Sequence, residues 1–469
     1  MSDATTIAAR ATPAGQGGIA VVRLSGPRSR AVLDTVFRPM AGEPGFTPWK
    51  LRHGRVVDAS GEALDDVLAV FMPGPRSFTG EDTAEVHCHG GPAVVEAVLA
   101  ACLAAGAEPA ERGEFTRRAF MNGRMDLTQA EAVAEIIAAP GRDALRYCLR
   151  RLDGELGRRV EGLRARLEEL RVHMSLAVDF PDDEVECLPR DRFLDVVTTV
   201  RDALDLLLAG VRRARYAQEG ARVVLAGSVN VGKSSLLNAV IGRARALVTD
   251  IPGTTRDFLE ELVDFDGLPA RLVDTAGLRE TGDPVERLGV ERSRGQVRDA
   301  DVLLIVVDGA ALGPDGAACA VCPDETARAL LASSLAMPML VVWNKADLVA
   351  PSALPPRWSR HAGLPVPAVA VSAVTGDNIE GLVRAASALL RADLPPEGDG
   401  VAPNLRQARD LEAARDELAR LAVAITDGLP YDLLSVHLEL ACMRLRGMVG
   451  LGTAQDVLDR VFADFCIGK

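Results

Sequence analysis

The sequence is poor in lysine, in aromatic residues and in long apolar runs. Only four of its 53 basic residues are lysines, so each lysine is a candidate for a position that needs a compact ammonium group rather than the planar guanidinium of arginine. Aromatic side chains make up 4% of the 469 residues, too few for a surface that stacks nucleic-acid bases. No apolar run reaches the length of a membrane-spanning helix, which predicts no membrane association.

Positive charge is also in deficit. The formal net charge is -13, which argues against avid, non-specific binding to nucleic acid, because neutralising phosphates takes an excess of Lys and Arg. An RNA partner would have to meet a local patch or a companion protein. The start of the chain lacks the basic and apolar segments of a signal peptide, and the eight cysteines show no disulfide spacing. We therefore expect a cytoplasmic protein with reduced thiols.

The pattern of the sequence changes along its length, and 469 residues are enough for several domains. Short β-like runs and one Ala-rich helix predict a small α+β domain over residues 1–119. Helical stretches rich in Leu, Arg and Glu predict a first helical segment over 120–217. Strands and helices alternate over 218–392, as in an α/β domain with a parallel sheet, and helical character returns over 393–469. We therefore predict a multidomain α+β and α/β fold, with the α/β domain inserted into one discontinuous helical domain.

A glycine-rich segment, GSVNVGKS from Gly227 to Ser234, fits the pattern G-x-x-x-x-G-K-[ST] and follows an apolar run that predicts a strand. In such a loop, backbone N–H groups and the next helix N-terminus surround the β-phosphate of a nucleotide. Lys233 would reach the β and γ oxygens, and the Ser234 hydroxyl would bind Mg²⁺. The segment therefore predicts a Ras-like P-loop domain.

Later motifs predict which nucleotide binds. In DTAG, which ends a hydrophobic run, Asp274 would support the magnesium shell and the Gly277 N–H would sense the γ-phosphate. In NKAD, the Asp347 carboxylate would accept hydrogen bonds from N1–H and the exocyclic amine of guanine, a pairing that adenine does not offer. We therefore expect the bound nucleotide to be GTP. The predicted GTP-binding residues are Asn230, Val231, Gly232, Lys233, Ser234, Ser235, Thr249, Asp250, Ile251, Pro252, Gly253, Thr254, Thr255, Asp274, Thr275, Ala276, Gly277, Asn344, Lys345, Asp347, Ser372 and Ala373.

The residue that orients the attacking water does not follow from these motifs. Ras-like proteins use a Gln after the DTAG-type motif, but Leu278 stands there in this chain. A leucine side chain cannot position water. The polar side chains close by in sequence are Arg279, Glu280 and Glu286, and the residues alone do not choose among them.

Longer segments of the chain resemble the tRNA-modification GTPase MnmE (TrmE) family over essentially its whole length. They are ATPAGQGGIAVVRLSG, SFTGEDTAEVHCHGGP, RGEFTRRAFMNGRMDLTQAEAV, DTAGLRETGDPVERLGVERS and the terminal FCIGK. The resemblance implies an N-terminal domain that forms a homodimer and binds a one-carbon tetrahydrofolate in its 5-formyl or methylene form. It also implies a heterotetramer with the flavoprotein MnmG. Together the two proteins would add an aminomethyl or carboxymethylaminomethyl group to C5 of the wobble uridine of certain tRNAs.

The same resemblance implies roles for individual residues. GTPase domains of this family dimerise in a potassium-dependent way, with K⁺ in the place of an arginine finger. The implied K⁺ ligands are Asn230, Thr249, Ile251 and Thr254, the Mg²⁺ ligands are Ser234 and Thr255, the catalytic residue is Glu286, and the folate-binding residues are Arg23, Glu81, Arg124 and Lys469. By turn preference alone, Asn230 is also a plausible loop cap. Some family members carry Lys where this chain has Arg124.

Other interpretations of the chain stay open. A ribosome-assembly or regulatory GTPase switch would share every nucleotide motif, but a basic RNA-binding appendage would be expected there. A membrane-remodelling GTPase would need an amphipathic or lipid anchor. Cys319 and Cys322, or His87 and His89, could suggest a metal, yet the sequence supplies no further ligands for either pair. Cys466 is either a reactive thiol or a buried one.

Overall fold

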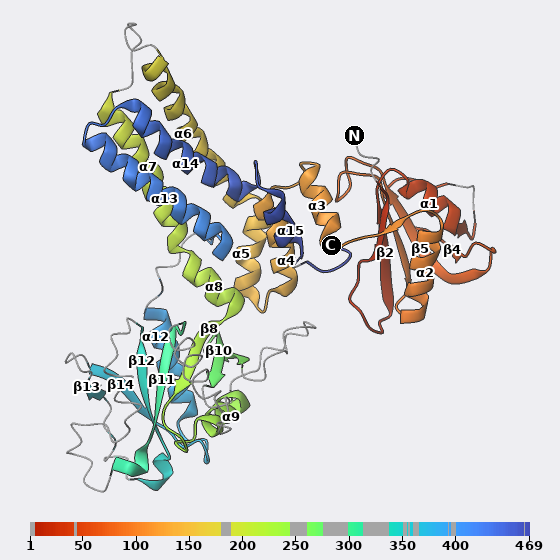
Figure 1. Cartoon of the computed structure of the whole chain (residues 1–469). Helices are drawn as coiled ribbons and strands as arrows, with labels where there is room; N and C mark the ends of the chain where they lie inside the picture. Colours follow the sequence, from red (N-terminus) through yellow and green to blue (C-terminus); the bar gives the residue numbers. More distant parts are fainter. Residues whose placement is uncertain are drawn as a thin grey trace, which may run out of the picture. The chain divides into compact units, whose positions relative to one another are not determined.

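The computed structural model describes residues 5–41, 45–179, 189–243, 260–274, 299–312, 337–349, 354, 357–359, 365–392, 394, 400–463 and 465–469. The chain forms two compact units, coloured along the sequence in Figure 1. The first unit comprises Met1–Ile137, Cys148–Leu206 and Arg406–Lys469, and the second comprises Ala138–Tyr147 and Leu207–Leu405. Helical segments from before and after the second unit therefore belong to the same first unit.

The first unit begins with a seven-stranded sheet of order β3-β4-β5-β6-β2-β1-β7, antiparallel except for β1 with β7. Apolar residues alternate along the central strands, as Ala20, Val22 and Leu24 do in β2, and pack against α1 and α2. The other face of β2 carries Arg23. The elements are β1 (Ile7–Arg10), β2 (Ile19–Ser25), α1 (Ser29–Val36), β3 (Phe37–Pro39), β4 (Arg52–Val57), β5 (Ala63–Met72), β6 (Thr83–His89), α2 (Pro92–Ala104) and β7 (Glu108–Pro109).

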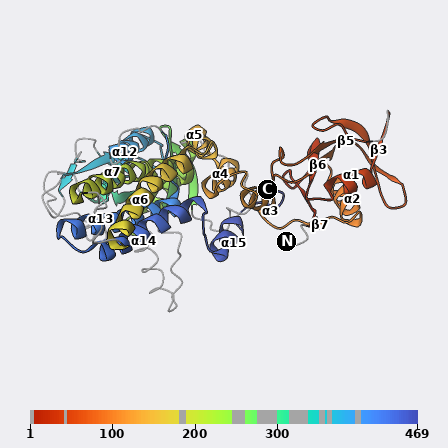
Figure 2. The ribbon, with the colours of Figure 1, turned by 90° about the horizontal axis from the view of Figure 1, so that it is seen from above.

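Long helices make up the rest of the first unit, and α6 lies alongside α14 in both views although some 270 residues separate them in the chain (Figures 1 and 2). Leu163, Leu167 and Leu170 are spaced three and four apart on α6 and are buried, as an amphipathic helix requires. The elements are α3 (Glu114–Met121), α4 (Leu127–Ala138), α6 (Glu155–Asp179), α7 (Arg190–Ala209), α13 (Leu405–Thr426), α14 (Tyr431–Val449) and α15 (Gln455–Ala463). Helix α5 (Arg142–Leu152) is divided between the two units, with its residues up to Tyr147 in the second.

A buried polar network joins the two helical segments. Glu131 on α4 is ion-paired with Arg406 on α13, and it accepts a hydrogen bond of 2.6 Å from the side-chain amide of Gln407. Further along the chain, Phe462 and Phe465 pack with Leu127, which brings the end of the chain back to α4. The predicted helical domain is thus built from segments on both sides of the α/β insertion.

The second unit contains a seven-stranded sheet of order β13-β14-β12-β11-β8-β10-β9, in which the five inner strands are parallel. Strands β8, β11 and β12 are nearly continuous apolar runs because both faces of the sheet are covered. The elements are α8 (Val211–Glu219), β8 (Ala221–Ala226), α9 (Lys233–Arg243), β9 (Glu260–Phe265), β10 (Leu268–Asp274), β11 (Val302–Asp308), η2 (Gly309–Leu312), β12 (Met339–Asn344), η3 (Ala346–Leu348), β13 (Arg357–Ser359), β14 (Pro365–Ala370) and α12 (Ile379–Ala392).

The predicted fold class is confirmed: a mixed helix and sheet chain with an α/β domain of P-loop topology. Among the residues that the structure describes, no helix combines the length and the apolarity needed to cross a membrane. The carboxyl ends of β8, β10, β11 and β12 lie at one edge of the second sheet, since these strands are parallel neighbours. Ligands of such sheets bind at this edge.

Candidate GTP site and a second polar cluster

The loop between β8 and α9 has the backbone of a phosphate-binding loop. Gly227 and Gly232 have φ angles of 152° and 92°, and Asn230 has a φ of 65°. A β-carbon on Gly227 would lie 2.2 Å from the carbonyl oxygen of Val306, and one on Gly232 would lie 2.3 Å from the Nδ2 atom of Asn344. Only glycine fits at these two positions, because a side chain would meet both a strained backbone and a neighbouring atom.

Polar side chains at the start of α9 match the needs of a nucleotide and its metal. The Lys233 ammonium is buried and donates hydrogen bonds to the carbonyls of Gly227 at 2.8 Å and Ser228 at 2.7 Å. The Ser234 hydroxyl donates to the Asp274 carboxylate at 2.8 Å. A hydroxyl and a carboxylate side by side are oxygen ligands of the kind that Mg²⁺ prefers. The donor set therefore fits the predicted ion, with Asp274 placed beside Ser234 by the pairing of β10 with β8.

The loop that ends β12 braces the phosphate loop. Asn344 is buried, and its side-chain amide donates to the carbonyl of Val231 at 2.8 Å and accepts from the N–H of Ala373 at 3.1 Å. Asn344 therefore ties together the phosphate loop and the Ser372–Ala373 loop. Sequence reasoning expected a base-site residue here and missed this bracing role, for which NKAD alone carries no signal.

The other residues predicted to bind the guanine base lie near Asn344. Lys345 has a φ of 63° and forms an ion pair of 2.6 Å with Asp308 at the end of β11. Asp308 was missed by sequence reasoning, although its place at the end of an apolar strand could have identified it. Asp347 is exposed on η3, and the buried Ser372 hydroxyl accepts from the N–H of Thr375 at 3.2 Å. The structure thus places the predicted base residues in adjacent loops.

A second polar cluster lies on the face of the N-terminal sheet that carries Arg23, opposite the face that packs on α1 and α2, and α3 contributes to it. Arg23 forms an ion pair of 2.9 Å with Glu85 and donates a hydrogen bond of 3.4 Å to the carbonyl of Gly468. Its guanidinium also lies 5.9 Å from the centroid of the Phe78 ring and 5.8 Å from that of Phe115. Arg23 is therefore held in place by an acid, a carbonyl and two aromatic rings.

The other residues predicted to bind folate belong to the same cluster. Burial and the nearby Arg23 guanidinium hold the pKa of Lys469 below its usual range. Glu81 accepts hydrogen bonds from the Ser25 hydroxyl at 2.7 Å and from Arg118 at 3.2 Å. The stem of Arg124, an exposed side chain, lies against Gly80, the neighbour of Glu81.

This cluster is suited to a ligand that carries both donors and carboxylates. The Glu81 carboxylate offers acceptors, and the cations offer partners for anionic groups. The residues that sequence reasoning missed are Glu85, Arg118 and Ser25, which hold Arg23 and Glu81 in place. They lie in the same family-like sequence segments as the predicted residues. These segments therefore indicated the region, but they did not distinguish residues that contact a ligand from residues that position them.

Comparison with known proteins identifies the family. The family model described as "GTP-binding protein TrmE N-terminus" matches residues 6–124, and the model "MnmE helical domain" matches residues 127–466. The tRNA modification GTPase MnmE of Nitratidesulfovibrio vulgaris (strain Hildenborough) is 52% identical over 470 residues, covering 99% of each chain. This chain belongs to the MnmE family of tRNA modification GTPases.

More distant members of the family match equally completely. The MnmE proteins of Lawsonia intracellularis and Roseiflexus castenholzii are 42% and 43% identical, and the matches cover 99% of each chain. Among solved structures, the FeoB G-domain from Methanococcus jannaschii covers 36% of this chain and 97% of its own, at 19% identity and a TM-score of 0.25. This structural likeness is too weak to add to the family assignment.

Part of the site implied by the MnmE resemblance lies outside the described residues. This part holds the loop predicted to supply three K⁺ ligands, the end of DTAG and the glutamate predicted to be catalytic. The residues concerned are Thr249, Asp250, Ile251, Pro252, Gly253, Thr254, Thr255, Thr275, Ala276, Gly277, Leu278, Arg279, Glu280 and Glu286, and Cys319 and Cys322 also lie outside. Asn230 is described, with an exposed side chain, and its role as a K⁺ ligand or a loop cap stays a prediction.

The two histidines considered for a metal site each lie beside a carboxylate. His87 contacts Glu85 at 3.2 Å, and His89 contacts Asp65 at 2.7 Å, so the two rings lie beside separate carboxylates. Within the described part of the chain, no group of three or more potential metal ligands is found. Cys466 is exposed, which corrects the alternative of a buried thiol.

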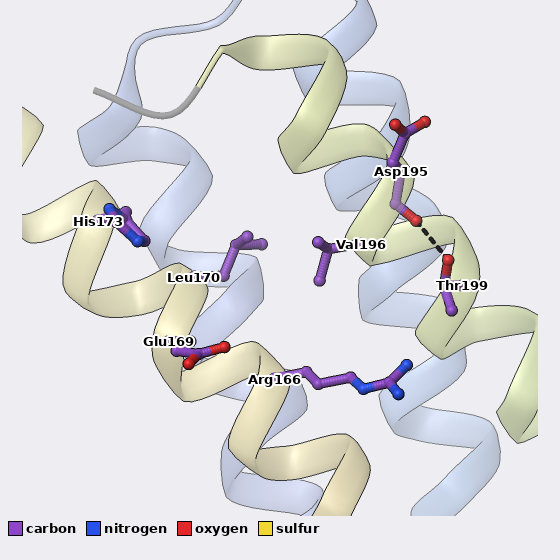
Figure 3. A pocket seen from close by; sticks show the side chains of 7 residues that line it. All are labelled: Arg166, Glu169, Leu170, His173, Asp195, Val196 and Thr199. Carbon is purple, nitrogen blue, oxygen red and sulfur yellow. Dashed lines mark hydrogen bonds between the residues drawn. The ribbon is translucent and has the colours of Figure 1, made fainter. Parts of the chain in front are cut away.

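A groove between two helices of the first unit contains none of the predicted site residues. Its volume is about 370 Å³, and α6 and α7 form its walls. The side chains that line it are Arg166, Glu169, Leu170, His173, Asp195, Val196 and Thr199 (Figure 3). The Thr199 hydroxyl donates to the carbonyl of Asp195 at 2.8 Å, so it is used within α7.

Proposed function

We propose that this protein hydrolyses GTP and, together with MnmG, adds an aminomethyl or carboxymethylaminomethyl group to C5 of the wobble uridine of certain tRNAs. The observation that carries the proposal is the match to MnmE proteins over 99% of both chains. A ribosome-assembly GTPase would share the nucleotide motifs but not the N-terminal and helical parts. We therefore favour tRNA modification over a regulatory switch.

In the proposed GTPase reaction, each side chain of the nucleotide site has a separate task. Lys233 would neutralise phosphate charge, and Asp347 would select guanine. Ser234 would hold Mg²⁺ together with Thr255, while Asp274 supports the metal shell. When bound, the metal offsets the negative charge of the phosphates. These tasks account for binding and charge, and they leave the attacking water to another residue.

Potassium and a glutamate would complete this reaction. We propose Glu286 as the residue that orients the water, because Leu278 has no polar group with which to do so. The exposure of Asn230 in the phosphate loop supports its proposed role as a K⁺ ligand, since an exposed side-chain carbonyl is accessible to a cation. The proposed further ligands are Thr249, Ile251 and Thr254. The bound cation would offset charge that develops at the phosphates, as an arginine finger does.

The N-terminal cluster supports the proposed binding of a one-carbon tetrahydrofolate, as the 5-formyl or methylene form. Glu81 would accept hydrogen bonds from the pterin amine and ring N–H, and Arg23, Arg124 and Lys469 would face the glutamate tail. We further propose a homodimer that joins MnmG in a heterotetramer, with the tRNA bound by the complex rather than by this acidic chain alone. A cytoplasmic location is part of the same proposal.

The decisive experiment compares GTP turnover in potassium and in sodium at equal ionic strength. We expect turnover to rise in potassium only, and Asn230→Ala to remove the rise. Val229→Ala is the matched control, because Val229 is the exposed neighbour of Asn230 in the same loop and offers no ligand. Equal rates in both salts would contradict the potassium mechanism. Failure of the protein and MnmG to modify tRNA, tested by nucleoside mass spectrometry, would contradict the proposed modification.

A further inference from the structure

A buried carboxylate lies at the end of the second sheet opposite the phosphate loop. Asp301 precedes β11, and its side chain is only 5% exposed. One carboxylate oxygen accepts from the N–H of Arg222 at 2.8 Å, and the other is ion-paired with Arg215 of α8. The N–H of Asp301 also donates to the carbonyl of Arg222 at 2.8 Å. One side chain therefore ties α8 to the starts of both β8 and β11.

The neighbouring Tyr216 attaches α8 to the core. Its ring is fully buried among the apolar residues of the sheet. The guanidinium groups of Arg212 and Arg215 lie 5.6 Å and 5.2 Å from the ring centroid, and the Nε atom of Arg212 donates to the Tyr216 hydroxyl at 3.0 Å. Burial and the nearby Asp301 carboxylate raise the pKa of Tyr216 to about 12, so the phenol stays protonated. We call Asp301, Arg212, Arg215 and Tyr216 the clamp.

The connection from α8 to β8, the strand that leads to the phosphate loop, is closely packed. Gly220 connects α8 to β8 with a φ of 82°, and a β-carbon there would lie 2.7 Å from Leu262. Arg271 of β10 donates to the carbonyl of Glu219 at the end of α8, at 3.3 Å. β8 then leads directly to Gly227, over six residues that span about 20 Å at the usual strand rise. The clamp and the phosphate loop are therefore the two ends of one central strand.

The outgoing chain packs on the same helix. Gly210, just before α8, lies against Ala402, because a β-carbon on Gly210 would be 3.0 Å from the Ala402 side chain. Ala402 is buried with Ala214 and Ala217 of α8. The longer segment of the second unit runs from Leu207 to Leu405, so α8 and the residues around Ala402 lie close to the two ends of this segment. Both connections are thus packed onto one helix.

From these contacts we infer that the clamp makes α8 a rigid extension of the GTPase domain. A movement of the domain during GTP turnover is then transmitted through α8 to the helical segments instead of being absorbed at the connection. Asp301 and Arg215 are positioning residues, because they lie at the start of β8 whereas the phosphate loop follows its end. This inference rests on the proposed function, because it gives the GTPase cycle its mechanical connection to the modification chemistry.

The test uses the full-length protein with MnmG and the variants Arg215→Ala and Asp301→Asn. We expect GTP turnover in potassium within about twofold of the wild type, and tRNA modification reduced by at least about tenfold, since 1.4 kcal/mol of lost coupling already corresponds to a factor of ten. Arg215→Lys, which keeps the positive charge, should restore part of the modification. Arg243→Ala is the control, because it removes an arginine from an exposed ion pair with Glu380 in the same domain.

Hydrogen exchange provides an independent measurement of the clamp. In Arg215→Ala we expect the amides of α8 to exchange faster, while those of β8 keep their protection. Unchanged exchange in α8 would overturn the clamp itself. Faster exchange in α8 combined with tRNA modification at the wild-type rate would overturn the coupling. A fall in tRNA modification that is only proportional to the fall in GTP turnover would overturn it too. If even the wild type fails to modify tRNA, the proposed function fails, and the exchange of α8 still decides whether the clamp exists.

Discussion

Replacing Asn344 with alanine should weaken nucleotide binding through the shape of the loop rather than through contact with the base. The change removes the hydrogen bond of 2.8 Å to the carbonyl of Val231 and the one of 3.1 Å from the N–H of Ala373. Each bond contributes about 0.5–1.5 kcal/mol, and a buried group left without a partner costs about 1–3 kcal/mol. We expect a total of roughly 2–4 kcal/mol for the two bonds. Because nucleotide binding requires the braced loop, this corresponds to roughly 30-fold to 1000-fold in Kd.

The assay is a fluorescence titration with GDP, compared with XDP in an Asp347→Asn background. The amide of that variant can donate to the C2 oxygen of xanthine, whereas the Asp347 carboxylate cannot. Since Asn344 acts on the loop, Asn344→Ala should weaken GDP and XDP by the same factor. If the Kd of Asn344→Ala for GDP stays within threefold of the wild type, and the Kd for XDP changes no more than that, Asn344 does not hold the phosphate loop in its binding shape. A loss confined to GDP would show instead that Asn344 acts at C2 of the base, where guanine and xanthine differ.

Three further predictions follow from the glycines, the terminal lysine and the thiols. Gly232→Ala should abolish GDP binding in a titration, because a β-carbon there would lie 2.3 Å from a side-chain amide nitrogen, whereas Gly242→Ala, which meets nothing within 4 Å, should not. Because its pKa is lowered, Lys469 should lose its positive charge at a pH at which an ordinary lysine is still charged. Folate binding, measured by calorimetry, should therefore weaken as the pH rises into this range, and Lys469→Arg should remove the pH dependence. In the folded protein, maleimide should label the exposed Cys466 and spare Cys102, whose pKa burial raises to about 12; labelling of Cys102 first would contradict the structure.

Local patterns predicted the elements of the fold well. Alternation of apolar residues in β2 reflects a sheet with one covered face, and the apolar runs of β8, β11 and β12 reflect strands covered on both faces. The phosphate loop could be placed because its glycines are needed for the backbone itself. The predicted division at residue 217 differs from the compact units, which change at Leu207, because α8 packs on the α/β sheet although its composition is that of the helical segments.

Side chains that act as supports could not be distinguished from the sequence. In the sequence, Arg118 and Glu85 are indistinguishable from ordinary surface charges, yet Arg118 donates a hydrogen bond to Glu81 and Glu85 forms an ion pair with Arg23. Asp301 likewise stands in an unremarkable DAD segment. Sequence motifs indicate the residues that contact a ligand. A residue that positions another side chain is recognised only by its contacts, and these are with residues distant in sequence.

The sequence by itself determined the nucleotide chemistry, the order of the domains and the family, since these depend on residue types at short spacings and on similarity along the chain. The tertiary structure alone decided which distant residues meet. Arg23 reaches the carbonyl of Gly468 across 445 positions, and Arg406 reaches Glu131 across 275. The physical reason is that a buried charge needs a partner, and the partner is chosen by the path of the folded chain rather than by proximity along it.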